Sequence, residues 1–178
     1  MPVAQPIDVD RRARFDALFD RHYAAVRAYV VRRSAAGVVD DVMSETFLVA
    51  WRRIDTLPSD GLPWLLGVAR RVLANQRRAD ARRGALVELL ASVLPRSPIP
   101  EPAGEVFGDL GEAISALSPR EREALLLVAW EGLDPQRAAR VVGCAPAAFR
   151  ARLYRARRQL AAQLKPMPDA DRLPEEAR

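Results

Sequence analysis

A chain of 178 residues, 49% hydrophobic and 29% charged, can form one ordinary domain or two small ones, and it is too apolar to be a disordered chain. Its single cysteine excludes an internal disulfide and a cysteine-based zinc site. The net charge is +5, with 15 basic and 10 acidic side chains in residues 1–83, 1 and 5 in 84–117, and 10 and 4 in 118–165. Two arginine-rich blocks predict a polyanionic partner such as DNA. A generally high arginine content would produce the same charge pattern without such a partner.

Three helices are predicted in the first basic block. Apolar residues at three-and-four spacing from Phe15 to Val30 indicate an amphipathic helix that ends near Gly37. A second helix of the same kind is predicted from Val39 to Ile54.

The third helix is predicted to have Pro63 in its first turn and an apolar face that starts at Trp64. Its other face is basic and amide-bearing, and contains Arg70, Arg71, Asn75, Gln76, Arg77 and Arg78. Cations and amides suit phosphates and base edges, so this face is a candidate DNA surface. The alternative is that this basic face is exposed to solvent and binds nothing. The helical spacing of Trp64 favours a place in the core over a role in stacking on bases.

The proline run at 95–102 predicts a flexible linker, because proline cannot continue a helix. A short helix is predicted over 106–117. Ser118, Pro119 and Glu121 then form the pattern of a capping box at the start of another helix.

A helix-turn-helix is predicted next. Asp134 should cap a short helix that ends at Gly143, and Pro146 should open a basic last helix. The candidate DNA contacts are Arg137, Ala147, Ala148, Arg150, Ala151, Arg152 and Arg155. The small side chains can offer methyl contacts to thymine and the arginines can reach phosphates. Cys144 falls in the turn, where packing is favoured over redox sensing.

The predicted fold class is therefore all-α, with two small helical domains. We expect an N-terminal domain over 11–84, a linker over 85–111, a C-terminal helix-turn-helix domain over 112–165 and a tail over 166–178. With one histidine, His22, and one cysteine, the chain offers no nucleophile, base or metal constellation, so neither catalysis nor a cofactor is expected. No apolar leader or membrane-length run is present, which predicts a cytoplasmic protein without membrane insertion.

From about Phe15 to Leu164 the order of these motifs resembles the extracytoplasmic-function (ECF) sigma factors of bacterial RNA polymerase. The segment from Val39 to Arg52 is similar to the family's polymerase-binding helix. The resemblance implies docking on the clamp coiled coil of the β′ subunit by Asp40, Asp41, Glu45, Phe47 and Trp51.

The segment 63–78 looks like the part of the family that melts and reads the minus-ten promoter element. The family commonly has Asn at the place of Arg71 and Asp at the place of Asn75. Residues 117–143 are similar to the minus-thirty-five reading domain, which also rests on the β-subunit flap. The resemblance implies promoter DNA and core RNA polymerase as partners, together with an anti-sigma factor.

Two other functions are compatible with the residues. A stand-alone helix-turn-helix regulator would use only 118–165 on DNA and would dimerise through the N-terminal helices. An enzyme acting on nucleic acid would need acidic or nucleophilic clusters beside the basic faces, and the sequence shows none.

Overall fold

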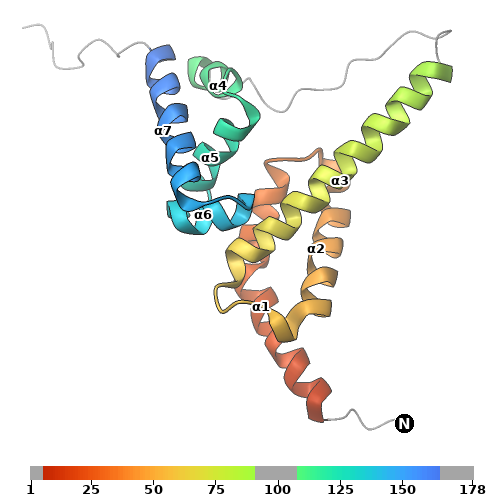
Figure 1. Cartoon of the computed structure of the whole chain (residues 1–178). Helices are drawn as coiled ribbons and strands as arrows, with labels where there is room; N and C mark the ends of the chain where they lie inside the picture. The colour runs from red at the N-terminus through yellow and green to blue at the C-terminus, as the bar shows by residue number, and fades with distance from the viewer. Residues whose placement is uncertain (1–5, 91–107, 165–178) are drawn as a thin grey trace, which may run out of the picture.

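The computed structural model describes residues 6–90 and 108–164, and over these ranges the chain is helical with no strand (Figure 1). The predicted all-α class is confirmed. The proline run of the predicted linker and the tail from residue 166 lie outside the described residues. The elements are α1 (Pro6–Val31), the 3-10 turn η1 (Ala36–Val38), α2 (Val39–Arg53), the 3-10 turn η2 (Ile54–Thr56), α3 (Gly61–Leu90), α4 (Gly108–Ser115), α5 (Pro119–Ala129), α6 (Pro135–Val142) and α7 (Pro146–Gln163).

Helices α1, α2 and α3 pack on one another and form what we call the N-terminal unit. Their apolar faces meet in a core that includes Val26, Val42, Leu65 and Ala69, each fully or almost fully buried. Such burial of one stripe on each helix is what holds short helices together, because an isolated helix of this length is marginal in water.

Three boundaries in the N-terminal unit differ from the sequence prediction, the first being the start of α1 at Pro6, before the pattern that begins at Phe15. Helix α1 ends at Val31, before Gly37, where the Ser34 hydroxyl donates a hydrogen bond of 2.8 Å to the Val30 carbonyl and competes with the backbone. Helix α3 continues through Gly84 to Leu90. One glycine costs a helix only about 1 kcal/mol, which the surrounding good helix formers offset.

Helices α4 to α7 form the C-terminal unit, and its predicted caps are confirmed. The Ser118 side chain accepts a hydrogen bond from the backbone N–H of Glu121, and Asp134 accepts from two backbone N–H groups at the start of α6. Gly143 has φ of +70°, the left-handed conformation that favours glycine, and it turns the chain into α7. Phe149 and Leu153 of α7 are buried in the core. The unit is the predicted helix-turn-helix.

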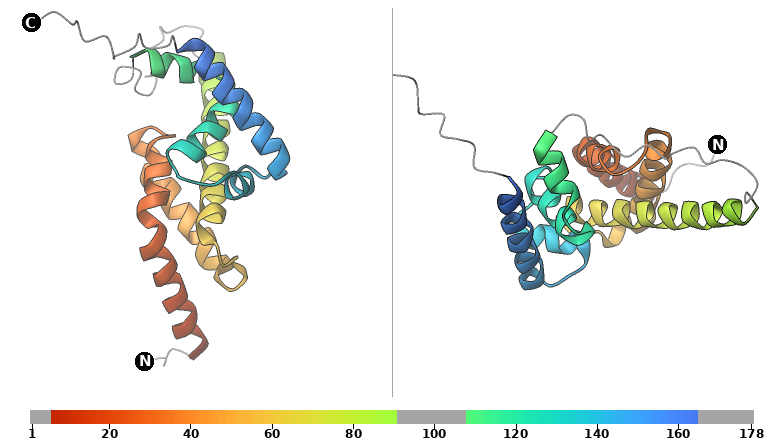
Figure 2. Two further views of the ribbon diagram at one scale, coloured as in Figure 1. Left: turned by 90° about the vertical axis from the view of Figure 1, so that its left-hand side faces the viewer. Right: turned by 90° about the horizontal axis from the view of Figure 1, so that it is seen from above.

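The two units pack against each other through α6, which lies along the N-terminal half of α3 (Figures 1 and 2). The two helices are close at Gly67 of α3, where an added Cβ would lie 3.5 Å from the Val141 carbonyl oxygen, an ordinary van der Waals distance. Buried residues of both units belong to one continuous cluster. We call this contact between the two units, in which α6 packs on α3, the seam. Its position determines which of the predicted surfaces remain exposed.

Candidate nucleic-acid interface

The acidic face of α2 is open. Asp40, Asp41 and Glu45 are exposed, and within the residues that the structure describes none of them forms an ion pair. Asp40 and Asp41 lie in the first turn, where a negative charge also stabilises the helix N-terminus. Three unpaired carboxylates on one helix form a surface that a basic partner would complement.

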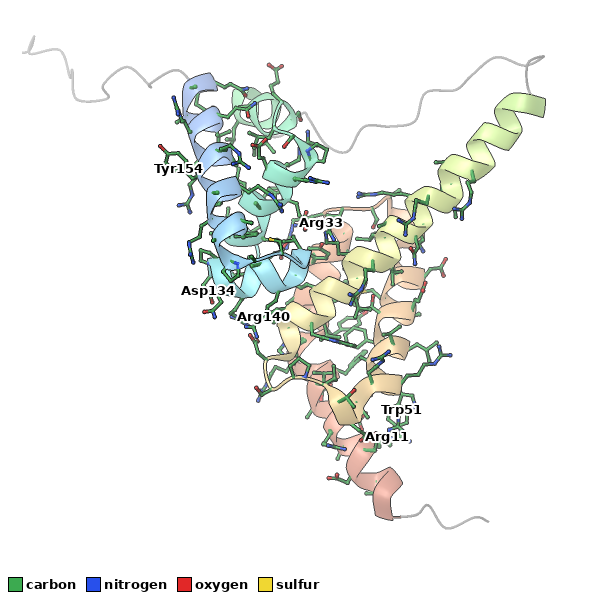
Figure 3. The ribbon with its side chains drawn as sticks, in the orientation of Figure 1. Arg11, Arg33, Trp51, Asp134, Arg140 and Tyr154 are labelled. Atoms are coloured by element: carbon green, nitrogen blue, oxygen red, sulfur yellow. The ribbon has the colours of Figure 1, made fainter. Side chains whose placement is uncertain are left out.

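The two aromatic residues predicted beside this face have different positions. Phe47 is only 6% exposed, and its ring packs against those of Phe19 and Tyr23 at centroid distances of 4.7 and 6.0 Å. We therefore correct its predicted role from contact with a partner to fixing α2 on α1. Trp51 is half-buried against Phe15, with the guanidinium of Arg11 over its ring at 5.1 Å (Figure 3).

The basic face of α3 is exposed at Arg70, Arg71, Asn75, Arg77 and Arg78. Gln76 and Trp64 are half-buried. A groove of about 460 Å³ runs between α2 and α3, lined by Glu45, Val49, Arg53, Trp64, Val68, Arg71, Val72 and Asn75. The groove joins the acidic face of α2 to the basic face of α3.

Helix α7 presents the predicted small and basic residues to solvent. Ala147, Ala148, Arg150 and Ala151 are exposed near its start. Tyr154, which the sequence analysis did not select, is 66% exposed on the same helix (Figure 3). An exposed aromatic ring among arginines suits contact with sugars and bases.

The remaining predicted contacts of the C-terminal unit are partly engaged by carboxylates. Arg137 donates two hydrogen bonds, of 2.9 and 2.8 Å, to the carboxylate of Asp60, which precedes α3. Arg155 lies 3.4 Å from Glu121. Arg152 faces a cavity at the seam and is discussed with it. Arg137 is therefore not free for DNA in this arrangement.

A cavity of about 520 Å³ at the seam brings together parts of both predicted DNA surfaces. Arg70 and Arg77 line it from α3, and Arg152 lines it from α7. Its other lining residues are Tyr29, Arg33, Leu73, Ala74, Pro119, Arg120, Glu123, Val142, Gly143 and Cys144. The two basic faces, far apart in the sequence, thus partly face each other.

The seam also contains residues that the sequence analysis did not select as site residues. They are Arg32 and Arg33 at the end of α1, Asp60 before α3, Glu123 and Glu131 around α5, and Arg140 of α6. Their pairs join residues 77 to 99 positions apart. Ion pairs between residues so far apart in the sequence leave no local pattern, so they could be identified only from the tertiary structure.

The described residues contain neither a metal-binding cluster nor a helix that could span a membrane. No cluster of histidine, cysteine and acidic side chains there has the arrangement needed to hold a metal ion. None of the helices there combines the length and the apolar character of a membrane span.

Comparison with protein families matches the two units separately. The model for sigma-70 region 2 matches residues 18–83, and the model for sigma-70 region 4 matches residues 107–160. The chain is 32% identical over 155 residues to the ECF RNA polymerase sigma factor EcfG of Rhodopseudomonas palustris, which covers 84% of this chain and 86% of that one. It is 35% identical over 151 residues to the ECF sigma factor SigC of Mycobacterium tuberculosis, covering 78% and 76%.

A further relative is much longer than this chain. The probable RNA polymerase sigma factor RfaY of Xanthomonas campestris is 34% identical over 142 residues, which cover 75% of this chain but only 35% of RfaY. Among solved structures, the complex of the sigma factor RpoE with the anti-sigma factor NepR from Bartonella quintana contains a similar chain, with a TM-score of 0.62 and 27% identity over 86% of this chain and 98% of that one.

Proposed function

The chain belongs to the ECF group of the sigma-70 family, and we propose that it binds core RNA polymerase and directs promoter-specific initiation of transcription. The polymerase performs the chemistry, and this chain supplies recognition and helps to open the DNA.

One observation carries the proposal: a single chain combines an unpaired acidic face on α2 with basic faces on α3 and α7. The acidic face suits docking on a protein, because phosphates would repel it. The basic faces suit DNA. A regulator that binds DNA alone has no need of the first surface.

We propose the following roles for individual residues, on the basis of their exposure and of the family to which the chain belongs. Asp40, Asp41 and Glu45 dock on the clamp coiled coil of the β′ subunit. The α3 face around Arg71 and Asn75 contacts the minus-ten element, and polar contacts to an extruded base there offset the few kcal/mol that unstacking costs.

The C-terminal unit contacts the minus-thirty-five element through the start of α7. Alanine methyls at 147, 148 and 151 meet thymine methyls, and Arg150 meets a phosphate. We assign 11–84 and 112–165 as the two recognition domains, and we propose an anti-sigma protein as the partner that restrains them, in line with the RpoE–NepR complex of the structural relative.

Run-off transcription with purified core polymerase on a promoter library tests the proposal. We expect promoter-dependent transcripts only when this chain is added. A gel-shift assay with and without core polymerase tests the rival regulator, which would bind an operator at full affinity alone. Absence of transcripts, together with tight operator binding by the isolated chain, would favour that rival.

Replacing Arg150 with alanine is expected to weaken binding to the upstream promoter element. Loss of one phosphate contact should also reduce the slope of log affinity against log salt by about 0.9. Arg158→Ala is the matched control, because Arg158 is exposed on the same helix and its loss changes the net charge equally. Equal effects of the two variants on affinity and slope would show that Arg150 contributes only general charge.

A further inference from the structure

The cavity of about 520 Å³ at the seam is strongly cationic. Its walls come from α1 and the residues just after it, from α3, α5 and α6, and from α7. Among the described residues, the charged side chains that line it are five arginines and one carboxylate: Arg33, Arg70, Arg77, Arg120, Arg152 and Glu123. Guanidinium groups gathered around one space repel one another unless an anion lies between them. The lining therefore favours an anionic ligand.

The carboxylate of the lining leaves most of this positive charge uncompensated. Glu123 accepts hydrogen bonds from Arg33 at 3.0 Å and from the Tyr29 hydroxyl at 2.9 Å. Within the part of the chain that the structure describes, three of the other lining arginines form no ion pair: Arg70, Arg120 and Arg152. Each of these guanidinium groups can donate several hydrogen bonds to a phosphate.

Arg33 gives a second and independent indication of a ligand. Its side chain is 8% exposed, and its Nε and Nη1 groups pair with Glu123 at 3.0 Å and with Glu131 at 2.9 Å. Its Nη2 group is buried and has no hydrogen-bond partner among the described residues. Buried donors without a partner are rare in folded proteins. Because Arg33 lines the cavity, where the two units meet (Figure 3), an anion bound there can supply the acceptor.

The walls of the cavity are held in place by packing. Leu73 lines it and belongs to the apolar cluster that runs through both units. Arg77 donates a hydrogen bond of 2.6 Å to the Arg33 carbonyl, which connects α3 to the end of α1 across the cavity wall. Small-molecule sites are usually preformed and have volumes of about 300–1,000 Å³. The cavity meets both conditions.

Apolar side chains form another part of the lining. They are Leu73, Ala74, Pro119 and Val142. Sites for small molecules commonly combine such apolar walls with a few charged groups that fix the orientation of the ligand. A ligand that carries a ring and a chain of phosphates can use both parts of this lining.

We propose that the seam cavity binds a small polyphosphate of the class of nucleoside di- and triphosphates. Arg70, Arg120 and Arg152 pair with the phosphate chain, and the ring lies against the apolar part of the lining. Since the ligand contacts both units, it strengthens their packing. The inference goes beyond the proposed function, because the site needs neither polymerase nor promoter DNA.

Inorganic tripolyphosphate and ATP are the two probes, and each is titrated into the full chain in magnesium-free buffer. We expect one-to-one binding by calorimetry and a rise in the melting temperature with ligand concentration, because the site exists only in the folded chain. ATP should bind more tightly than tripolyphosphate, since only ATP has a ring for the apolar walls. Equal affinity of the two probes would overturn the nucleoside part of the proposal.

The single cysteine of the chain provides a readout at the site itself. Cys144 is half-buried and lines the cavity. Bound ATP should slow the alkylation of Cys144 by uncharged iodoacetamide in proportion to the fraction of chain occupied. Binding that leaves the alkylation rate unchanged would place the ligand elsewhere and overturn the proposal.

Arg120→Gln combined with Arg152→Gln removes two proposed phosphate partners and keeps long polar side chains. Each lost charge-assisted contact should weaken tripolyphosphate binding about tenfold. Arg157→Gln with Arg158→Gln is the matched control, because both arginines are exposed on α7 outside the lining and the charge change is the same. Equal losses in the two double variants would show a general charge effect and overturn the proposal.

Arg70→Gln extends the test to the N-terminal unit. Arg70 is exposed on α3, so its replacement should leave the helicity measured by circular dichroism unchanged and weaken binding about tenfold. Unchanged affinity in this variant would contradict a site shared by the two units. Absence of binding by both probes would overturn the inference whether or not the chain supports transcription, and binding without any polymerase-dependent transcript would leave the ligand site established.

Discussion

Replacing Asp41 and Glu45 with arginine is expected to abolish association of this chain with core RNA polymerase. Both carboxylates are exposed on α2 and free of ion pairs within the described residues, so reversal of their charge turns attraction to a basic surface into repulsion. Like charges brought together across an interface cost several kcal/mol, which is enough to lower affinity a thousandfold or more, at about 1.4 kcal/mol per tenfold. Co-purification with tagged core polymerase measures the loss.

The control must change charge equally without touching α2. Asp20→Arg with Glu112→Arg does so, because these acids are exposed on α1 and α4. The fold should persist in both double variants, since surface substitutions of this kind usually change the free energy of unfolding by about 0.5 kcal/mol or less. Undiminished co-purification of the α2 variant, or equal loss in the control, would contradict the docking assignment.

The helices could be predicted from sequence where their signals are local. The capping box at Ser118 and Glu121, the Asp134 cap and the left-handed Gly143 each depend on a few adjacent residues, and each is present in the structure. The end of α1 was not predicted well. There a side-chain hydrogen bond from Ser34 ends the helix before the glycine that the pattern suggested.

The candidate site could be predicted only in part, because burial and long-range pairing are tertiary properties. The family resemblance implies a polymerase contact for Phe47, but three aromatic rings from α1 converge on it and bury it. Arg137 looks like a free DNA contact in the sequence, whereas Asp60, 77 positions away, occupies it. Nothing in either local segment predicts that pairing.

Replacing Phe149 with alanine is expected to unfold the C-terminal unit selectively. Phe149 of α7 is fully buried, and truncation of a buried phenylalanine costs about 3–5 kcal/mol. That is a large part of the stability of a unit of about 50 residues, which buries only a modest core. Denaturant unfolding followed by circular dichroism should show an early transition that removes part of the helical signal.

Tyr154→Ala is the matched control, because it removes another aromatic ring from the same helix at a position that is 66% exposed. It should leave the unfolding transition nearly unchanged. Phe149→Ala should also abolish recognition of the upstream element while keeping association with polymerase, since the acidic face of α2 lies in the other unit. Joint loss of both activities would mean that the acidic face of α2 depends on the C-terminal unit for its binding, and that the two surfaces do not work independently.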